Sequence, residues 1–375
     1  MLLVTFHGGS GGISNVYAYD TTTGALLTQG ALQQAPPSEA ELRGMICANS
    51  LFYVVDGGKV GSNILCYNLP AAGSNNFKYI GEFIGPSVSK SKGKFKNSIG
   101  HPYGMVFDTA GNCYISNQDT NVVAVAEVAS DFQTAAVKKG CRSSYLNGVT
   151  SICPTTGCVY LDGTFVASQM GTLPDVDVDA TDVPAQYGGL AVSFSTDTSA
   201  DTGPADHSHS KSKDKVQNSV RDVAIWGSVL LVCDEPASCV RLYSLPDGSY
   251  LGASNVPKSP THLAICSNGL YVSAGNQLYW SALSSPLTVS SLSFQSVLTA
   301  PAAMNAYDVG GVTFDSISNA AYVAYQQGKG TTGSGAIYSY TVTPGSMQSS
   351  PPTLTNATIF ATICADTPEF LLFLP

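Results

Sequence analysis

The chain has 375 residues, of which 17 are Lys or Arg and 26 are Asp or Glu, so its formal net charge is −9. Hydrophobic residues make up 44% of the chain, which excludes a wholly disordered protein. No apolar run approaches the roughly 18 residues of a membrane-spanning helix, so we expect none. The chain does not open with the basic segment, apolar segment and small-residue cleavage site of a secretory leader, so we expect none. The acidic balance argues against nucleic acid as a partner.

Short apolar or alternating runs, separated by turn residues, recur along the whole chain. Leu51–Val55 precedes Asp56-Gly57-Gly58, and Gly269–Ser273 precedes Ala274-Gly275-Asn276. Runs of about five residues bounded by Gly, Asn and Asp are typical of strands. Only 11% of the residues are charged, and no long window has the 3.6-residue period of a helix. We therefore predict an all-β protein.

These runs are organised in a repeating unit, whose first strand contains a small residue and whose third strand is rich in Tyr. Units of about 40–50 residues with four strands are typical of β-propeller blades. We therefore predict a single β-propeller of about seven four-stranded blades, with six as the alternative if residues 147–195 are an insertion. The first strands are expected to start near residues 43, 102, 147, 221, 261, 309 and 367.

The two ends of the chain are expected to share one blade. Leu2–His7 has the character of a second strand, and Val16–Asp20 that of a third. The missing first strand is supplied by Glu369–Phe373, and this pairing closes the ring. Residues 1–375 then form a single domain, with loop insertions at about 86–99 and 195–219.

One segment resembles a known repeat. His101–Asn117 contains Pro102-Tyr103-Gly104, an apolar strand, Asp108-Thr109-Ala110-Gly111-Asn112 and then a strand with an aromatic residue. In this order of features it resembles the NHL-like and YVTN-like β-propeller repeats. The resemblance implies a propeller fold. Members of such families include binding scaffolds, lyases and lactonases, so the resemblance does not select a function.

Polar residues gather at the predicted mouth of the central channel. In a propeller, the loops before first strands and after second strands share one face, where ligand sites usually lie. Residues at those points are therefore expected to converge. The candidate catalytic residues there are His7, His101, His262 and Asp222. The candidate ligand-binding residues there are Arg43, Tyr103, Arg221 and Asp308. The candidate metal ligands there are Asp56, Asp234 and Glu235.

Two interpretations of this mouth remain open. Arginines suit an anionic group, while histidines and carboxylates suit proton transfer or metal binding. These properties predict an enzyme, either a lactonase-like hydrolase or a lyase. Alternatively, Arg–Asp pairs fill the channel of a propeller that has no catalytic role. Convergence of these groups around an open site distinguishes the enzyme from the scaffold.

Two similar lysine-rich segments, Ser89–Ile99 and Ser210–Val220, each precede a first strand and are expected on the same face. Our main interpretation is a binding protein that uses this face to hold a protein partner or an anionic small molecule. The alternative is a pair of solvated loops without a partner. The candidate contacts are Lys90, Lys92, Lys94, Lys96, Lys211, Lys213 and Lys215.

An acidic run, Asp175–Asp182, is a candidate calcium site, with Asp175, Asp177 and Asp179 as ligands. It departs from the EF-hand pattern, because Ala180 replaces the turn glycine and Gln186 stands where the bidentate glutamate belongs. An exposed acidic edge is the alternative. We therefore predict no cofactor, and a divalent cation such as calcium is the alternative.

The chain has ten cysteines, and two pairs of them bracket predicted turns. Cys153 with Cys158, and Cys233 with Cys239, are each expected across a hairpin at a separation that a disulfide spans. Disulfides would indicate an oxidising compartment. The location stays open: the protein is cytoplasmic if Met1 is the native start, and secreted if a leader has been removed.

Overall fold

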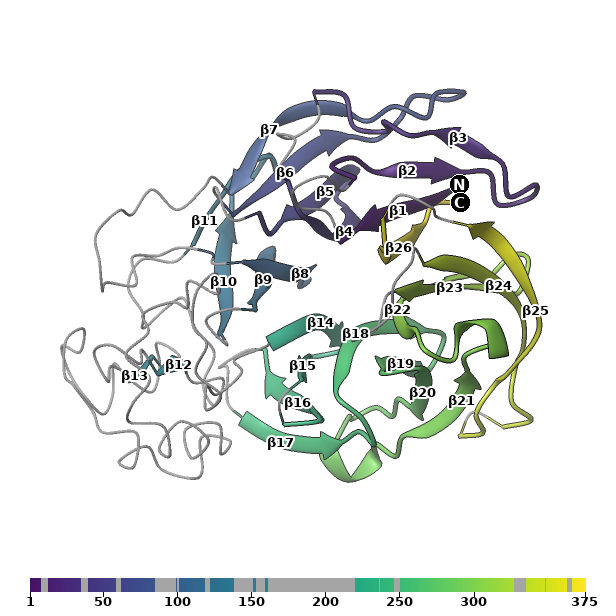
Figure 1. Cartoon of the computed structure of the whole chain (residues 1–375). Coiled ribbons are helices and arrows are strands. Elements are labelled where there is room, and N and C mark those ends of the chain that lie inside the picture. The colour runs from purple at the N-terminus through teal and green to yellow at the C-terminus, as the bar shows by residue number, and fades with distance from the viewer. Residues whose placement is uncertain are drawn as a thin grey trace, which may run out of the picture.

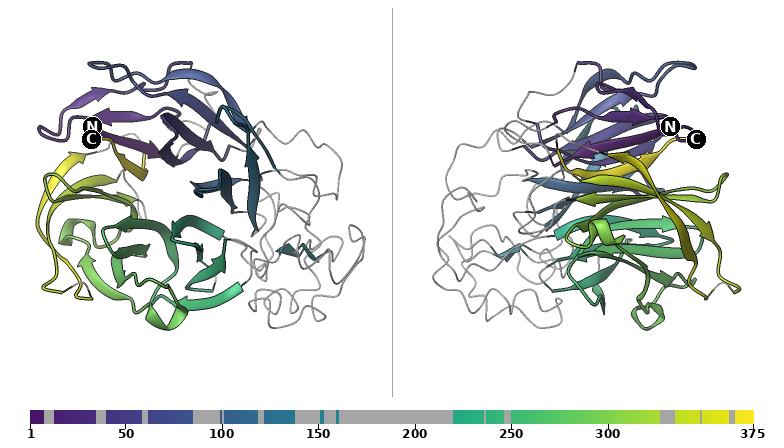
Figure 2. Two further views of the ribbon diagram at one scale, coloured as in Figure 1. Left: turned by 180° about the vertical axis from the view of Figure 1, so that it is seen from behind. Right: turned by 45° about the vertical axis from the view of Figure 1, so that its right-hand side comes forward.

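The chain folds into a ring of antiparallel sheets, shown in the computed structural model of Figure 1. In the described part of the chain, six sheets have four strands each, so the structure is an all-β propeller of six blades. Figure 2 shows the same ring from behind and from one side. The structure describes residues 1–7, 13–34, 40–58, 62–84, 99, 101–118, 122–137, 151–152, 159–160, 220–235, 237–245, 250–326, 335–347, 349–362 and 366–375.

Blades 1 to 3 are built from the N-terminal strands of the chain together with its last strand. From the innermost strand outward, blade 1 consists of β26 (Pro368–Phe373), β1 (Leu2–Phe6), β2 (Tyr17–Tyr19) and β3 (Leu26–Thr28). Blade 2 consists of β4 (Leu42–Ala48), β5 (Leu51–Asp56), β6 (Asn63–Asn68) and β7 (Lys78–Ile84). Blade 3 consists of β8 (Pro102–Phe107), β9 (Asn112–Asn117), β10 (Val122–Val128) and β11 (Ala135–Val137).

The other three blades follow the same order. Blade 4 consists of β14 (Val220–Trp226), β15 (Val229–Asp234), β16 (Cys239–Ser244) and β17 (Tyr250–Asn255). Blade 5 consists of β18 (Pro260–Cys266), β19 (Gly269–Ala274), β20 (Gln277–Ala282) and β21 (Gln295–Thr299). Blade 6 consists of β22 (Asp308–Asp315), β23 (Ala320–Gln326), β24 (Ala336–Thr343) and β25 (Thr353–Thr362).

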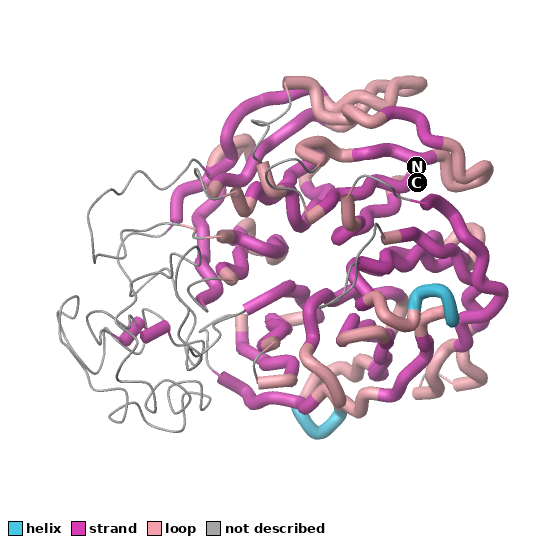
Figure 3. Tube along the Cα trace, viewed as in Figure 1, coloured by secondary structure: helices cyan, strands magenta, loops and turns pink. Residues whose placement is uncertain are grey.

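Four short elements stand apart from the blades. The strands β12 (Ser151–Ile152) and β13 (Val159–Tyr160) form a two-stranded sheet of their own. The 3-10 helices η3 (Val289–Ser291) and η4 (Ala302–Met304) flank β21. Figure 3 shows that strands and connecting loops otherwise make up the described chain. None of the described helices has the length and apolar character needed to cross a membrane.

The ring closes without a seventh blade. The inner strands β26, β4, β8, β14, β18 and β22 contact one another in that order, and β22 returns to β26. Because β8 contacts β14 directly, no described sheet stands between blades 3 and 4. The prediction of about seven blades is therefore wrong, and the six-blade alternative is confirmed. The start of the first strand predicted near residue 147 lies outside the described residues, and the described residues that follow it form only the small β12–β13 sheet.

The two ends of the chain complete blade 1. The strand β26 pairs antiparallel with β1, so that Leu2 lies opposite Phe373 and Val4 opposite Leu371. The chain ends accordingly lie side by side in Figure 1. This pairing joins the first and last parts of the ring, as the sequence predicted.

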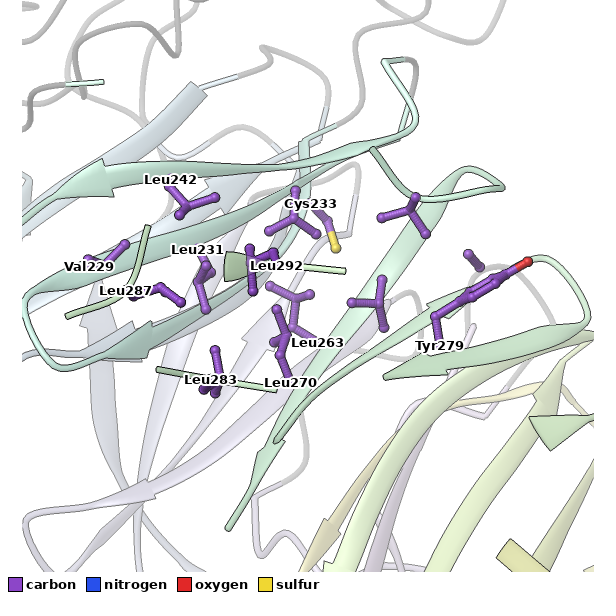
Figure 4. Close-up of a cluster of buried hydrophobic side chains, with 14 residues drawn as sticks. Val229, Leu231, Cys233, Leu242, Leu263, Leu270, Tyr279, Leu283, Leu287 and Leu292 are labelled. Carbon is purple, nitrogen blue, oxygen red and sulfur yellow. The ribbon is translucent and has the colours of Figure 1, made fainter. Parts of the chain in front are cut away.

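Hydrophobic clusters between neighbouring blades form the core. The continuous apolar run of β15 is buried along its whole length, because both of its faces pack against other sheets. Figure 4 shows the cluster between blades 4 and 5, in which Leu231 and Leu242 of blade 4 meet Leu263 and Leu270 of blade 5. This packing fixes the positions of the inner strands and of the side chains that they carry.

Each inner strand contains a bulge at the same end of the ring. In blade 2, Leu42 pairs with Asp56 but Met45 pairs with Val54, so β4 has one extra residue there. Equivalent register shifts occur in the other five blades. A bulge bends the strand and redirects its side chains. We call this end of the ring the mouth; it is the end at which the inner strands begin.

The segment that resembles an NHL-like repeat forms β8, a turn and β9. The Asp108 carboxylate accepts hydrogen bonds from the backbone N–H groups of Ala110 and Asn112, both through Oδ1. Gly111 has a φ of +84°, a conformation that favours glycine. The Asp-x-x-Gly-Asn pattern therefore builds the turn at the end of the blade opposite to the mouth.

The predicted Cys233–Cys239 disulfide does not form, and both residues are free thiols. In the antiparallel pair of β15 and β16, Cys233 lies opposite Val240 and Cys239 lies opposite Asp234. Since neighbouring residues of a strand point to opposite faces of a sheet, the two thiols face away from each other. The sequence separation fitted a hairpin, but the register excludes the bond. Cys153 and Cys158 lie outside the described residues.

Candidate functional site

The mouth carries a cluster of polar side chains from five different blades. Arg43, Tyr103, Arg221 and Glu369 are the second residues of their inner strands, where the bulges lie. Glu41 and His101 lie just before inner strands, and His7 and Glu235 follow second strands. We call the following residues the mouth cluster: His7, Glu41, Arg43, His101, Tyr103, Arg221, Glu235, His262 and Glu369.

Arg43 lies at the centre of the mouth cluster, with its side chain 2% exposed. Its Nη1 donates hydrogen bonds to Glu369 Oε2 and, over 2.9 Å, to Nδ1 of His7. Its Nη2 donates to Glu41 Oε2 over 3.1 Å. Burial by itself disfavours both charges, but their pairing raises the pKa of Arg43 and lowers the pKa of Glu369 well below its usual value. Both groups are therefore charged at neutral pH.

Two histidines lie on either side of this guanidinium. The His7 side chain is 64% exposed, and its Nδ1 is 3.6 Å from Glu369 Oε2. The His101 side chain is 18% exposed, and its Nε2 is 3.6 Å from Glu41 Oε2. Each imidazole therefore has a carboxylate beside it and reaches solvent. Histidine with a neighbouring carboxylate is suited to proton transfer near neutral pH.

The deep side of the mouth cluster is formed by Tyr103 and His262, each 1% exposed. The Tyr103 hydroxyl oxygen is 3.0 Å from His262 Nε2 and also forms a hydrogen bond with Glu369. Burial lowers the pKa of His262 to about 3, so its imidazole is neutral. Because ionised Glu369 only accepts, Tyr103 donates to it and the His262 Nε2–H donates to the tyrosine oxygen. The hydrogen bonds thus run from His262 through Tyr103 to Glu369, which also accepts from Arg43 on its other side.

Arg221 is the more accessible arginine, with its side chain 19% exposed. Its Nε donates to Glu235 Oε2 over 2.7 Å. Its guanidinium carbon lies 4.9 Å from the centre of the Tyr103 ring, a cation–π arrangement that holds the group in place. Arg221 is therefore both fixed and within reach of a ligand oxygen.

Asp222 binds backbone groups rather than the mouth cluster. Its Oδ2 accepts from the Leu263 N–H over 3.0 Å, and its Oδ1 accepts from the Val223 N–H over 2.9 Å. The first of these bonds ties blade 4 to blade 5. Burial raises the pKa of Asp222 to about 7. The structure thus gives this predicted catalytic residue contacts that join two blades.

The Gly104→Ala variant is expected to lose about 1–3 kcal/mol of stability. A Cβ atom on Gly104 would overlap with Oδ1 of Asp222 and lie 3.2 Å from its Cα. Gly81→Ala is the matched control, because nothing lies within 4 Å of its added Cβ. Its stability is expected to change by less than about 0.5 kcal/mol. Urea unfolding of both variants measures the difference, and equal midpoints would contradict the prediction.

The carboxylates predicted as metal ligands lie in other contacts. Asp56 accepts from the backbone N–H groups of Glu41 (3.1 Å) and Gly58 (2.9 Å). Asp234 accepts from the Arg241 Nε over 2.6 Å. Across the part of the chain that the structure describes, no three His, Cys, Asp or Glu side chains are grouped so as to hold a metal ion. Asp175, Asp177 and Asp179 lie outside the described residues.

The remaining predicted residues are Asp308, which lies at the mouth end of the ring, and the lysines of the basic loops. Asp308 begins β22, and burial raises its pKa although Lys258 lies nearby. The basic loops lie outside the described residues, so their proposed role in binding stays a prediction. They contain Lys90, Lys92, Lys94, Lys96, Lys211, Lys213 and Lys215.

Seven of the predicted residues lie in the mouth cluster: His7, Arg43, His101, Tyr103, Arg221, Glu235 and His262. Sequence reasoning missed Glu41 and Glu369, the two carboxylates that contact Arg43. A signal for Glu369 was present, since it follows Pro368 at the second position of β26, as Tyr103 follows Pro102 in β8. The apolar character of the following residues concealed it.

No family model and no curated protein matches the chain. Among solved structures, it is similar to a periplasmic gluconolactonase of Pseudomonas aeruginosa, with 13% identity, 100% of this chain and 98% of that chain covered, and a TM-score of 0.55. A putative 6-phosphogluconolactonase of Bacteroides uniformis has 9% identity, the same coverage and a TM-score of 0.55. A protein of Lactobacillus plantarum has 13% identity, 95% and 81% coverage, and a TM-score of 0.51. These likenesses show the propeller fold alone, and the NHL-like or YVTN-like family stays a prediction.

Proposed function

We propose that the chain hydrolyses small cyclic esters at its mouth. The observation that carries this proposal is the pair of solvent-reaching histidines, His7 and His101, on either side of the buried Arg43. Opening a lactone needs one group that removes a proton from water and one that protonates the departing alkoxide. Two imidazoles, each with a carboxylate neighbour, supply that pair.

The hydrogen bonds assign a different role to each histidine. Because Arg43 can only donate, the Nδ1 of neutral His7 accepts from it and Nε2 carries the proton. His7 thus presents an N–H group for the leaving oxygen. Glu41 faces the Nε2 of His101 and favours a proton there, which gives Nδ1 the lone pair that a base requires. Water adds to the ester carbonyl and its proton passes to His101. The ring C–O bond then breaks, the departing alkoxide takes the Nε2 proton of His7, and the proton held by His101 returns to His7 through solvent.

Arg221 is assigned the task of holding the substrate. Its Nε is used by Glu235, and the terminal amino groups of a guanidinium remain as donors for a carbonyl or carboxylate oxygen. The mouth cluster contains two arginines and the three glutamates Glu41, Glu235 and Glu369. With neutral histidines it therefore has a net charge of −1. This balance favours an uncharged lactone over a phosphorylated one. Two structural neighbours, a periplasmic gluconolactonase and a putative 6-phosphogluconolactonase, support the choice of a lactone as the substrate class.

The test is the hydrolysis of glucono-δ-lactone, followed with a pH indicator after subtraction of the uncatalysed rate. The protein is expected to accelerate it, and to act less well on the 6-phosphorylated lactone. His7→Gln and His101→Gln are each expected to lower kcat/KM by at least about tenfold. Thr353→Val, on the outer strand β25, is the control and is expected to retain full activity.

Two results would contradict the proposal. The first is no acceleration with either lactone. The second is equal activity of the two histidine variants and the wild type. Treatment with EDTA is expected to leave the rate unchanged, because the proposed roles belong to side chains. An EDTA-sensitive rate would overturn this assignment of roles and favour a divalent cation.

A partner-binding propeller is the second candidate, and the pairing of Arg43 and Arg221 with carboxylates favours it. Such ion pairs are also typical of a channel filled by its own side chains. In that case the lysine-rich loops are the expected contacts for an acidic partner. The lactone assay separates the candidates, because a channel filled by structural ion pairs gives no acceleration.

A further inference from the structure

A hollow lies between blade 1 and blade 6, toward the end of the ring opposite to the mouth. Its volume is about 510 Å³, within the range of small-molecule sites. One wall is the turn Thr21–Gly24 between β2 and β3, and the other is formed by blade 6. Both Thr21–Gly24 and the turn at Ser318–Asn319 follow strands that run away from the mouth. The hollow is therefore separate from the mouth cluster.

The described residues that line this hollow carry no charged side chain. Its lining is rich in hydroxyl and carboxamide groups, which both donate and accept hydrogen bonds. Two such pairs cross from β24 to β25: Ser339 Oγ lies 2.7 Å from Thr358 Oγ1, and Asn356 Nδ2 donates to Thr341 Oγ1 over 3.4 Å. All four of these side chains line the hollow, and Asn356 and Thr358 are exposed.

The two turns at its edge are held by carboxylates that point into the turns themselves. Asp20 Oδ1 accepts from the backbone N–H groups of Thr22 and Thr23. Asp315 accepts from the N–H of Ile317 and from the Ser318 hydroxyl. Neither aspartate lines the hollow. Both turns at the edge of the hollow are therefore held by their own hydrogen bonds, which reduces the ordering cost of binding.

Aromatic residues complete the lining. Phe360 lies edge-on to Tyr322, with the ring centres 5.0 Å apart, and both line the hollow. Gly24 allows the close approach of the turn to this strand, since a Cβ there would lie 3.1 Å from the Phe360 carbonyl oxygen. Tyr322 is only 3% exposed, so the ring carbon that a ligand meets beside the hydroxyl and amide groups is that of the partly exposed Phe360.

We propose that this hollow binds a neutral carbohydrate. A sugar presents many hydroxyl groups, which match the Ser, Thr and Asn side chains, and C–H faces, which match aromatic carbon. An anion or a cation finds no countercharge among the described lining residues. An apolar ligand would displace water from the hydroxyl and amide groups without replacing the hydrogen bonds to that water, which costs free energy. The neutral, hydroxyl-rich ligand is the one that satisfies both kinds of wall.

The test measures the binding of four neutral disaccharides, maltose, cellobiose, lactose and sucrose, to the full chain by saturation-transfer NMR and calorimetry. The protein is made in a bacterial host, so that Asn356, which begins an Asn-Ala-Thr sequon, carries no glycan. At least one disaccharide is expected to bind, with an affinity that does not change between low and high salt. Digalacturonate, a charged disaccharide, is expected to bind more weakly.

The variant Ser339→Ala/Thr358→Val removes one hydroxyl pair and is expected to weaken binding by roughly fivefold or more. Thr353→Val is the matched control: it lies on the same strand, is exposed and does not line the hollow. Melting curves verify that both proteins are folded. The proposal is overturned if none of the four disaccharides binds at a concentration of about 20 mM, which would detect even a dissociation constant in the millimolar range. It is also overturned if the double variant binds as the control does, or if digalacturonate binds best.

Discussion

Replacing Arg43 with methionine is expected to lower the free energy of unfolding by about 3–5 kcal/mol. Methionine keeps an unbranched side chain but removes the charge that Glu369 and Glu41 contact. Glu369 is only 3% exposed, so water cannot replace the lost partner. Removing one member of a buried ion pair leaves an uncompensated charge, which is the main cost. Urea unfolding at pH 7 measures this loss.

A double variant separates the cost of leaving the Glu369 carboxylate without Arg43 from the cost of the lost side-chain packing. Arg43→Met/Glu369→Gln removes both charges and is expected to be more stable than Arg43→Met alone. The exposed Lys258→Met variant is the control and is expected to change stability by less than about 0.5 kcal/mol. The prediction is wrong if Arg43→Met is as stable as this control, or if the second substitution restores nothing.

The strand positions were predictable because each inner strand is marked twice. The first mark is an apolar run that follows a polar or proline residue. The second is that the second strand of the blade begins within a few residues of the end of this run. The predicted starts at 43, 102, 221, 261, 309 and 367 therefore lie within one residue of β4, β8, β14, β18, β22 and β26.

The number of blades was not predictable from spacing alone. Residues 138–219 are long enough for a further blade, and Gly148–Ile152 and Cys158–Leu161 have the composition of strands. Whether a sheet joins the ring depends on contacts between β8 and β14, which are far apart in the sequence. The Cys233–Cys239 prediction failed for a related reason. The sequence separation shows that the two cysteines can lie on neighbouring strands. It does not show the strand register, which decides the sheet face on which each thiol lies.

The sequence predicts several positions of the mouth cluster, but not which of its side chains form ion pairs with one another. Arg43 and His101 were found because they lie where inner strands begin, whereas Glu369, a partner of Arg43, comes from the other end of the chain. Glu369 is 326 residues from Arg43 in sequence, and only closure of the ring through β26 brings them together. The sequence alone could not show which carboxylate neutralises which arginine, because that depends on which blades are adjacent.

Asp222 and His262 are expected to give the protein opposite dependences of stability on pH. Burial raises the pKa of Asp222 from 3.8 to about 7, so its stabilising contribution is complete below pH 3.8 and lost as the pH rises through 7. Burial lowers the pKa of His262 from 6.5 to about 3, so its contribution is complete above pH 6.5 and lost as the pH falls through 3. Between pH 6.5 and 3.8 the two contributions change in opposite directions and offset each other.

Single variants should reveal each contribution. Relative to the wild type, Asp222→Asn is expected to lose stability by about 1.4 kcal/mol for each unit that the pH falls between about 6.5 and 4. His262→Gln is expected to gain by a similar amount over the same range. Each variant also carries a loss that does not depend on pH, since a carboxamide has one oxygen where Asp222 uses two to accept backbone N–H groups. The slope against pH is therefore the quantity to compare.

Urea unfolding at about pH 4.5, 5.5 and 6.5 measures these slopes, because these values lie between the folded and unfolded pKa values of both groups. Thr353→Val, exposed on β25, is the control and is expected to follow the wild type at every pH. Slopes parallel to the wild type in both variants would show that neither group titrates differently in the folded and unfolded chains. If the slope changes in Asp222→Asn alone, the protonated carboxyl of Asp222 stabilises the contact between blades 4 and 5. In that case His262 has the same pKa in the folded and unfolded chains.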